Sequence, residues 1–154
     1  MVVHFPLVLL MMVPVFLALA LYRKEPSGPY TVTAWILLAL GTVAAFVATM
    51  SGEAAESLVI ASDQVRQAIE HHSDLGEYAR DVAVVEFLLL SALLGWTLYL
   101  KRPIERRWLT GLMFVVFLVS LVGAALVAMT GHAGAYLVHG LGVTNTASFL
   151  PQLH

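Results

Sequence analysis

The chain has 154 residues, of which 60% are hydrophobic and only 12% are charged. Soluble domains are about 45–50% apolar and about 25% charged, so this composition is that of an integral membrane protein. The length leaves room for about four membrane spans and for no sizeable soluble domain. The absence of cysteine excludes disulfides, thiolate metal sites and covalent c-type haem. The formal net charge of -2 says little as a total, because the charges are sorted by position.

Four apolar segments predict four membrane-spanning helices, because a helix satisfies its own backbone hydrogen bonds in lipid. The segments cover residues of about 2–22, 34–50, 82–100 and 108–130. The first segment has no basic residues ahead of its apolar run, so we interpret it as a retained span and not as a signal peptide. The expected fold class is all-α, a four-helix transmembrane bundle that forms one integral membrane domain over residues 1–154.

The charges between the spans predict the orientation of the chain. Residues 53–81, the middle connector, hold seven acids against Arg66 and Arg80. The two short connectors are basic, which predicts that they lie in the cytoplasm and that the middle connector lies outside. Both termini are then periplasmic in a bacterial inner membrane. The short connectors hold six of the eight basic residues, namely Arg23, Lys24, Lys101, Arg102, Arg106 and Arg107.

The middle connector is itself expected to be helical. The pair Ser62-Asp63 predicts the start of a short helix that ends near His71, because both side chains are good helix caps. The pair Ser73-Asp74 predicts the start of the long third helix in the same way. Together with the C-terminal tail, residues 131–154, this connector is expected to form a helical cap on the outer face.

All six histidines fall on the predicted outer side. His4 and His132 are expected near the membrane boundary, and His72 and His139 about 10–15 Å further out at the rise of a helix. Imidazole is a common metal ligand and an axial ligand of haem iron, so one or two bis-histidine sites are predicted at this face. Each histidine taken alone is also compatible with a solvated surface position. The six are His4, His71, His72, His132, His139 and His154.

The residues around these histidines resemble a family. The resemblance to predicted four-span bacterial membrane proteins, catalogued as domain of unknown function 2231, covers essentially the whole chain. Ala135 stands where the family commonly has a second glycine, and Leu141 where it has a valine. The resemblance implies no activity, but it marks the histidines at 4, 72, 132 and 139 as the family-matching ones. It rests on His4-Phe5-Pro6, Ser51-Gly52-Glu53-Ala54-Ala55, His72-Ser73-Asp74-Leu75-Gly76, Gly131-His132-Ala133-Gly134 and His139-Gly140-Leu141-Gly142-Val143.

Haem b, in one or two copies, is the cofactor that these histidines favour, because two imidazoles can hold the iron without a covalent link. Arg80 and Arg66 are the candidate partners of the haem propionates, since they are the only lysines or arginines in the predicted outer regions. Glu86, the one acid well inside a span, is a candidate to orient a ligand imidazole. The candidate axial ligands are, in order of preference, His72, His139, His132 and His4.

The hypothesis is therefore a small electron-transfer subunit within a larger membrane redox complex, with a non-catalytic role preferred over that of an enzyme. Its partners would be lipid, sister subunits and a periplasmic redox protein attracted by the acidic connector. No outer basic patch favours nucleic acid. Two alternatives stay open: a copper- or zinc-binding protein, in which Met50 and Met129 could assist the histidines, and a structural subunit without cofactor.

Overall fold

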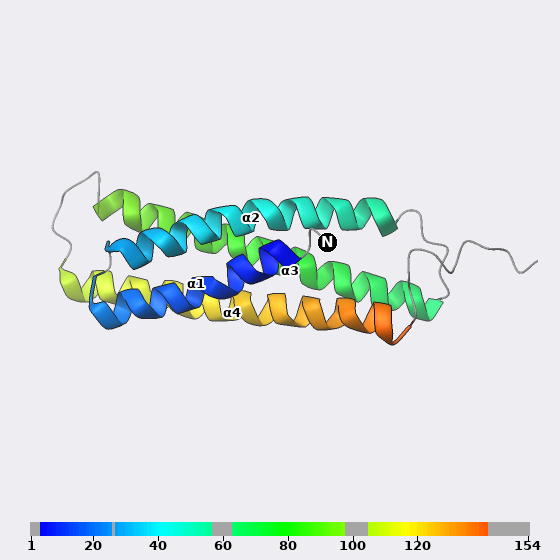
Figure 1. Ribbon diagram of the computed structural model, residues 1–154. Coiled ribbons are helices and arrows are strands. Elements are labelled where there is room, and N and C mark those ends of the chain that lie inside the picture. The colour runs from blue at the N-terminus through cyan, green and yellow to red at the C-terminus, as the bar shows by residue number, and fades with distance from the viewer. Residues whose placement is uncertain (1–3, 26, 57–62, 98–104, 142–154) are drawn as a thin grey trace, which may run out of the picture.

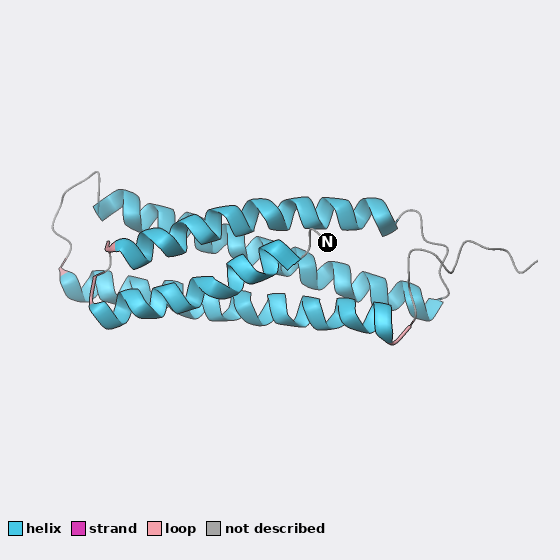
Figure 2. Ribbon diagram, viewed as in Figure 1, coloured by secondary structure: helices cyan, strands magenta, loops and turns pink. Residues whose placement is uncertain are grey.

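The computed structural model describes residues 4–25, 27–56, 63–97 and 105–141. These residues form four helices and no strand (Figure 2), which confirms the all-α prediction. Each helix packs against its neighbours in the cyclic order α1, α2, α3, α4. Consecutive helices run in opposite directions, so the bundle is antiparallel (Figure 1). The helices are α1 (His4–Arg23), α2 (Pro29–Glu56), α3 (Asp63–Gly95) and α4 (Arg106–His139).

The core of the bundle is built from aliphatic side chains that every helix contributes. Leu17, Leu38, Leu90 and Met113 are fully buried, one from each helix. Large apolar side chains also point away from the core along the outer faces of all four helices. A soluble protein would not expose so much contiguous apolar surface, so this outer surface is the one that contacts lipid.

Three helices are long and apolar enough to cross a membrane, over Phe5–Arg23, Pro29–Ala54 and Arg107–Gly140. They match three of the four predicted spans. The fourth predicted span, residues 82–100, begins in the apolar half of α3 and runs past Thr97, the last residue described there. This half of α3 lies against α2, where the indole of Trp35 donates a 2.8 Å hydrogen bond to Ser91 and stacks on Phe87.

Residues 63–81 and 131–139 of the predicted cap are helical, as expected, but one boundary among them is wrong; residues 57–62 and 142–154 lie outside the described part of the chain. The expected break between His71 and Ser73-Asp74 does not occur, because α3 runs without interruption from Asp63 to Gly95. Leu75, Ala79 and Ala83 lie on one buried face of α3. Burial of this face outweighs the local preference of serine and aspartate for helix starts.

The helices are unequal in length, with 20 residues in α1 and 28 to 34 in the others. Figure 1 shows α2, α3 and α4 reaching past the start of α1 at one end. A Cβ added to Gly131 would lie 3.2 Å from Leu7, which fixes the level at which α1 begins. We call this end, where α1 and α3 begin and α2 and α4 end, the histidine end.

Candidate functional site

The histidine end gathers five of the six histidines. His4 opens α1, His71 and His72 lie near the start of α3, and His132 and His139 lie in the last turns of α4. The antiparallel packing of α3 against α4 brings the two histidines of α3 and the two histidines of α4 to the same end of the bundle. The side chain of His4 and the whole of His154 lie outside the described part of the chain.

His72 is held against α4 by a hydrogen bond. Its Nδ1 lies 3.1 Å from the carbonyl oxygen of Thr130. A carbonyl oxygen only accepts, so Nδ1 carries the proton and donates it. In the neutral imidazole Nε2 then keeps its lone pair, which is the arrangement seen in histidines that bind metal while the other ring nitrogen donates to a carbonyl.

Gly134 makes this approach of His72 possible. A Cβ at position 134 would lie 3.1 Å from Cε1 of His72 and 3.5 Å from Nδ1. The imidazole therefore packs directly over the backbone of α4, at a place where any side chain would crowd it. The glycine of the Gly131-His132-Ala133-Gly134 motif has a packing reason at this position.

A groove of about 680 Å³ lies between α3 and α4 at the histidine end. His71 reaches it from α3 and His132 from α4, and both side chains are exposed. The volume is within the range of small-molecule sites, about 300–1,000 Å³. The walls are largely apolar and carry a few polar groups. The other lining residues are Gln64, Gln67, Ala68, Leu75, Ala128, Met129, Ala133 and Tyr136.

His71 is the residue of this groove that sequence reasoning missed, because only His72 matches the family motif. The signal that points to it is helical spacing. Gln64, Ala68, His71 and Leu75 recur at intervals of four, three and four residues, so they share one face of an unbroken helix. The predicted break after His71 would have ended that face before Leu75, whereas α3 continues it. His71 and His72 lie about 100° apart around α3, so one lines the groove while the other packs over Gly134.

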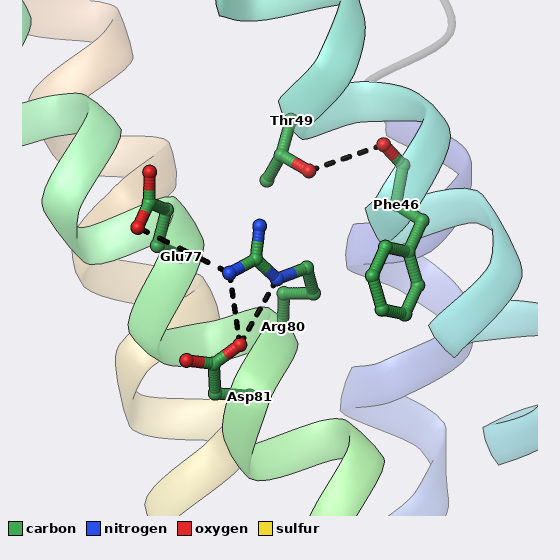
Figure 3. A network of polar contacts seen from close by, with 5 residues as sticks. All are labelled: Phe46, Thr49, Glu77, Arg80 and Asp81. Carbon is green, nitrogen blue, oxygen red and sulfur yellow. Dashed lines mark hydrogen bonds and ion pairs between the residues drawn. The ribbon is translucent and has the colours of Figure 1, made fainter.

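The two arginines proposed to bind propionates are not among the residues that line the groove. Figure 3 shows Arg80 between its partners. Its guanidinium lies 2.9 Å from Asp81 and 4.0 Å from Glu77, and 5.5 Å from the ring centroid of Phe46 on α2. Arg80 therefore joins α3 to α2 with its charge compensated. Arg66 is exposed on α3.

His139, the second preference among the predicted ligands, also lies outside the groove. It is exposed at the end of α4, where the backbone N–H of Gly140 closes the helix on the carbonyl of Tyr136. Of the two methionines considered for copper, Met129 lines the groove and Met50 does not. Within the described ranges, no three histidine, aspartate or glutamate side chains cluster closely enough to hold a metal ion.

Glu86 lies deep in the bundle. It is 3% exposed, and Oε2 lies 3.8 Å from where a Cβ of Gly123 would be. Fourteen residues separate it from His72, a rise of about 21 Å along α3. That distance is beyond the reach of a direct hydrogen bond, so Glu86 does not orient the imidazole of His72.

The fold and the lipid-facing surface define a helical integral membrane protein. Within this class, the chain belongs to the family described as Predicted membrane protein (DUF2231), whose model matches residues 1–147. The resemblance seen in the histidine motifs is thereby confirmed. No curated protein and no solved structure matches the chain.

Proposed function

We propose that this protein is a small electron-transfer subunit that binds a b-type haem in the groove between α3 and α4, where His71 and not His72 is the lining histidine of α3. The observation that carries the proposal is that His71 and His132, from two different helices, line one largely apolar groove of about 680 Å³. A lone metal ion needs no apolar space of this size, whereas a porphyrin does. Bound haem would supply one-electron transfer.

The residues of the groove fit the chemistry of haem. Imidazoles can hold the iron without a covalent link, and the chain has no cysteine for one. We therefore prefer His132 and His71, which line the groove, over His139, which does not, as the ligands of the iron. The amide groups of Gln64 and Gln67 line the same groove and can donate hydrogen bonds to propionates. His72, already fixed by Thr130, remains a candidate ligand through Nε2.

The setting of this subunit follows from the charge pattern. The positive-inside rule favours a bacterial inner membrane with the histidine end and both termini in the periplasm. Sister subunits of a redox complex would cover part of the lipid-facing surface. The acids on the outer half of α3, Glu70, Asp74, Glu77 and Asp81, would attract a basic periplasmic redox protein.

Copper binding is the second candidate, and Met129 is the observation that favours it. Met129 lines the same groove as His71 and His132. Two imidazoles and one thioether form a ligand set that suits Cu(I). The two candidates differ in what they need from Met129: copper requires its sulfur as a ligand, whereas haem requires only an apolar wall.

The deciding experiment is a reduced-minus-oxidised absorption spectrum of the purified protein, with haem and copper quantified per chain. We expect a b-type α-band that is lost in His132→Ala and His71→Ala and kept in the control His139→Ala. Met129→Leu should keep haem and would lose copper. A spectrum without haem bands overturns the haem proposal. Copper in place of haem would establish the second candidate. If the protein contained neither haem nor copper, the remaining alternative would be a structural subunit.

A further inference from the structure

The apolar part of the bundle contains one acid and no base. Residues 5–22, 29–52, 82–97 and 108–131 hold no aspartate, lysine, arginine or histidine, and Glu86 is their only glutamate. An ionisable side chain within a membrane span is costly, and such residues commonly face the bundle interior and mark ion or proton pathways. Glu86 therefore requires an explanation that the groove at the histidine end does not provide.

The surroundings of Glu86 leave its carboxyl group uncompensated. Its Oε1 is buried and is the only such side-chain atom without a hydrogen-bond partner among the described residues. The buried hydroxyls of Thr42 and Ser120 donate to carbonyls of their own helices, at 2.7 Å each. No charged or imidazole side chain faces Glu86 from the apolar stretches of α1, α2 or α4, because those stretches contain none. Arg80, the nearest base along α3, is engaged by Asp81 and Glu77.

Gly123 of α4 lies beside this carboxyl group. Oε2 of Glu86 and the side chain of Val82 both lie over Gly123, 3.8 Å and 3.4 Å from where its Cβ would be. These are ordinary van der Waals distances, so the carboxyl group packs against α4 at Gly123, within a bundle whose buried side chains are mostly aliphatic or small. Glu86 is therefore packed in the interior of the bundle, between α3 and α4.

We propose that Glu86 is a proton-binding site inside the membrane, whose carboxylate takes up a proton to become the neutral acid and releases it again. A proton needs a single oxygen, and the unpartnered Oε1 supplies one. A metal cation would need several oxygen ligands, and the described residues hold no cluster of acids or histidines around Glu86. This site goes beyond the haem proposal and does not depend on it.

Infrared difference spectroscopy tests the site directly. The protein in lipid nanodiscs is compared at acid and alkaline pH. Besides the carbonyl bands of its exposed acids, the wild type should gain on acidification a band at the higher frequency of a protonated carboxyl group out of contact with water. Glu86→Gln, which keeps the size of the side chain, should lose that band. The control Glu70→Gln, an exposed position on the same helix, should keep it. Equal difference spectra for the wild type and Glu86→Gln would overturn the proposal.

A second measurement needs no variant. Dicyclohexylcarbodiimide, an apolar reagent, reacts with protonated carboxyl groups inside membranes, and mass spectrometry locates the product. We expect labelling at Glu86 that falls as the pH rises and does not change with sodium. Protection by sodium would overturn the proton assignment in favour of a metal cation, and absence of labelling at every pH would exclude an exchangeable proton at Glu86.

Discussion

His71 and His72 are adjacent in the chain but contact different surfaces of the bundle. His72 donates to the Thr130 carbonyl and packs over Gly134, whereas His71 points into the groove with His132. A step of about 100° per residue around the helix separates them. The facing residue of α4 decides what each imidazole can do. His72 packs over Gly134, whereas His71 shares the groove with His132.

The first prediction at this scale concerns Gly134. Gly134→Ala places a methyl group 3.1 Å from Cε1 of His72, so we expect a loss of about 1–3 kcal/mol in stability from overpacking. Thermal unfolding in detergent measures the change. Gly111→Ala is the matched control on the same helix, because nothing lies within 4 Å of its Cβ. It should be neutral or stabilising by up to about 1 kcal/mol. Equal effects of the two substitutions would contradict this account.

A second prediction concerns the link between α2 and α3. Ser91→Ala removes the acceptor of the 2.8 Å hydrogen bond from Trp35. The cost should be about 1–3 kcal/mol, because the indole N–H is then left half-buried without a partner. Denaturant titration followed by tryptophan fluorescence measures it. Ser51→Ala is the control, since that exposed hydroxyl bonds only within its own helix; a cost as large as that of Ser91→Ala would count against a specific role for the link.

At the scale of elements, the continuity of α3 governs the site. A helix that ended at His71 and restarted at Ser73-Asp74 would still hold Gln64, Ala68 and His71 on one face, but it would separate them from Leu75. The unbroken helix instead places these residues in one row along the groove. The length of α4, which continues to His139, provides the opposite wall.

Proline substitution distinguishes the two arrangements. Asp74→Pro would be tolerated if Ser73 capped a new helix, because proline is favoured in the first helical position. In the interior of a continuous helix it should cost about 3 kcal/mol or more. Asp74 is exposed, so loss of packing does not confuse the comparison. Asp74→Ala is the control, and unfolding measurements that give the same stability for both variants would favour the broken helix.

At the scale of the whole molecule, the apolar outer surface and the length of α1, α2 and α4 place the bundle in lipid. Among the described residues, Arg23, Lys24, Arg106 and Arg107 lie at one end of the bundle, and five histidines lie at the other; the remaining two arginines, Arg66 and Arg80, are on α3. For a bundle with this asymmetry, the positive-inside rule predicts that the histidine end faces the periplasm.

The absence of native cysteine makes this orientation measurable. Gln67→Cys, at the histidine end, should react with a membrane-impermeant maleimide added to intact spheroplasts. Arg107→Cys, at the basic end, should react only after the membrane is permeabilised. Both positions are exposed in the structure. The reverse pattern of labelling would invert the topology and place the histidine end in the cytoplasm.

The sequence by itself determined the all-α class, the membrane character and the family, because apolar length and motif identity are local properties of the chain. It also located the histidines at one end, since span boundaries and helix direction follow from charge and hydropathy. Only the tertiary structure decided which histidines share a surface. That choice depends on how α3 and α4 are rotated against each other, and packing sets this rotation, including the close approach of His72 to Gly134. The predicted helix start at Ser73-Asp74 was wrong because it considered only local sequence. Burial of one face of α3, which only the tertiary structure decides, outweighs a capping preference worth about 1 kcal/mol.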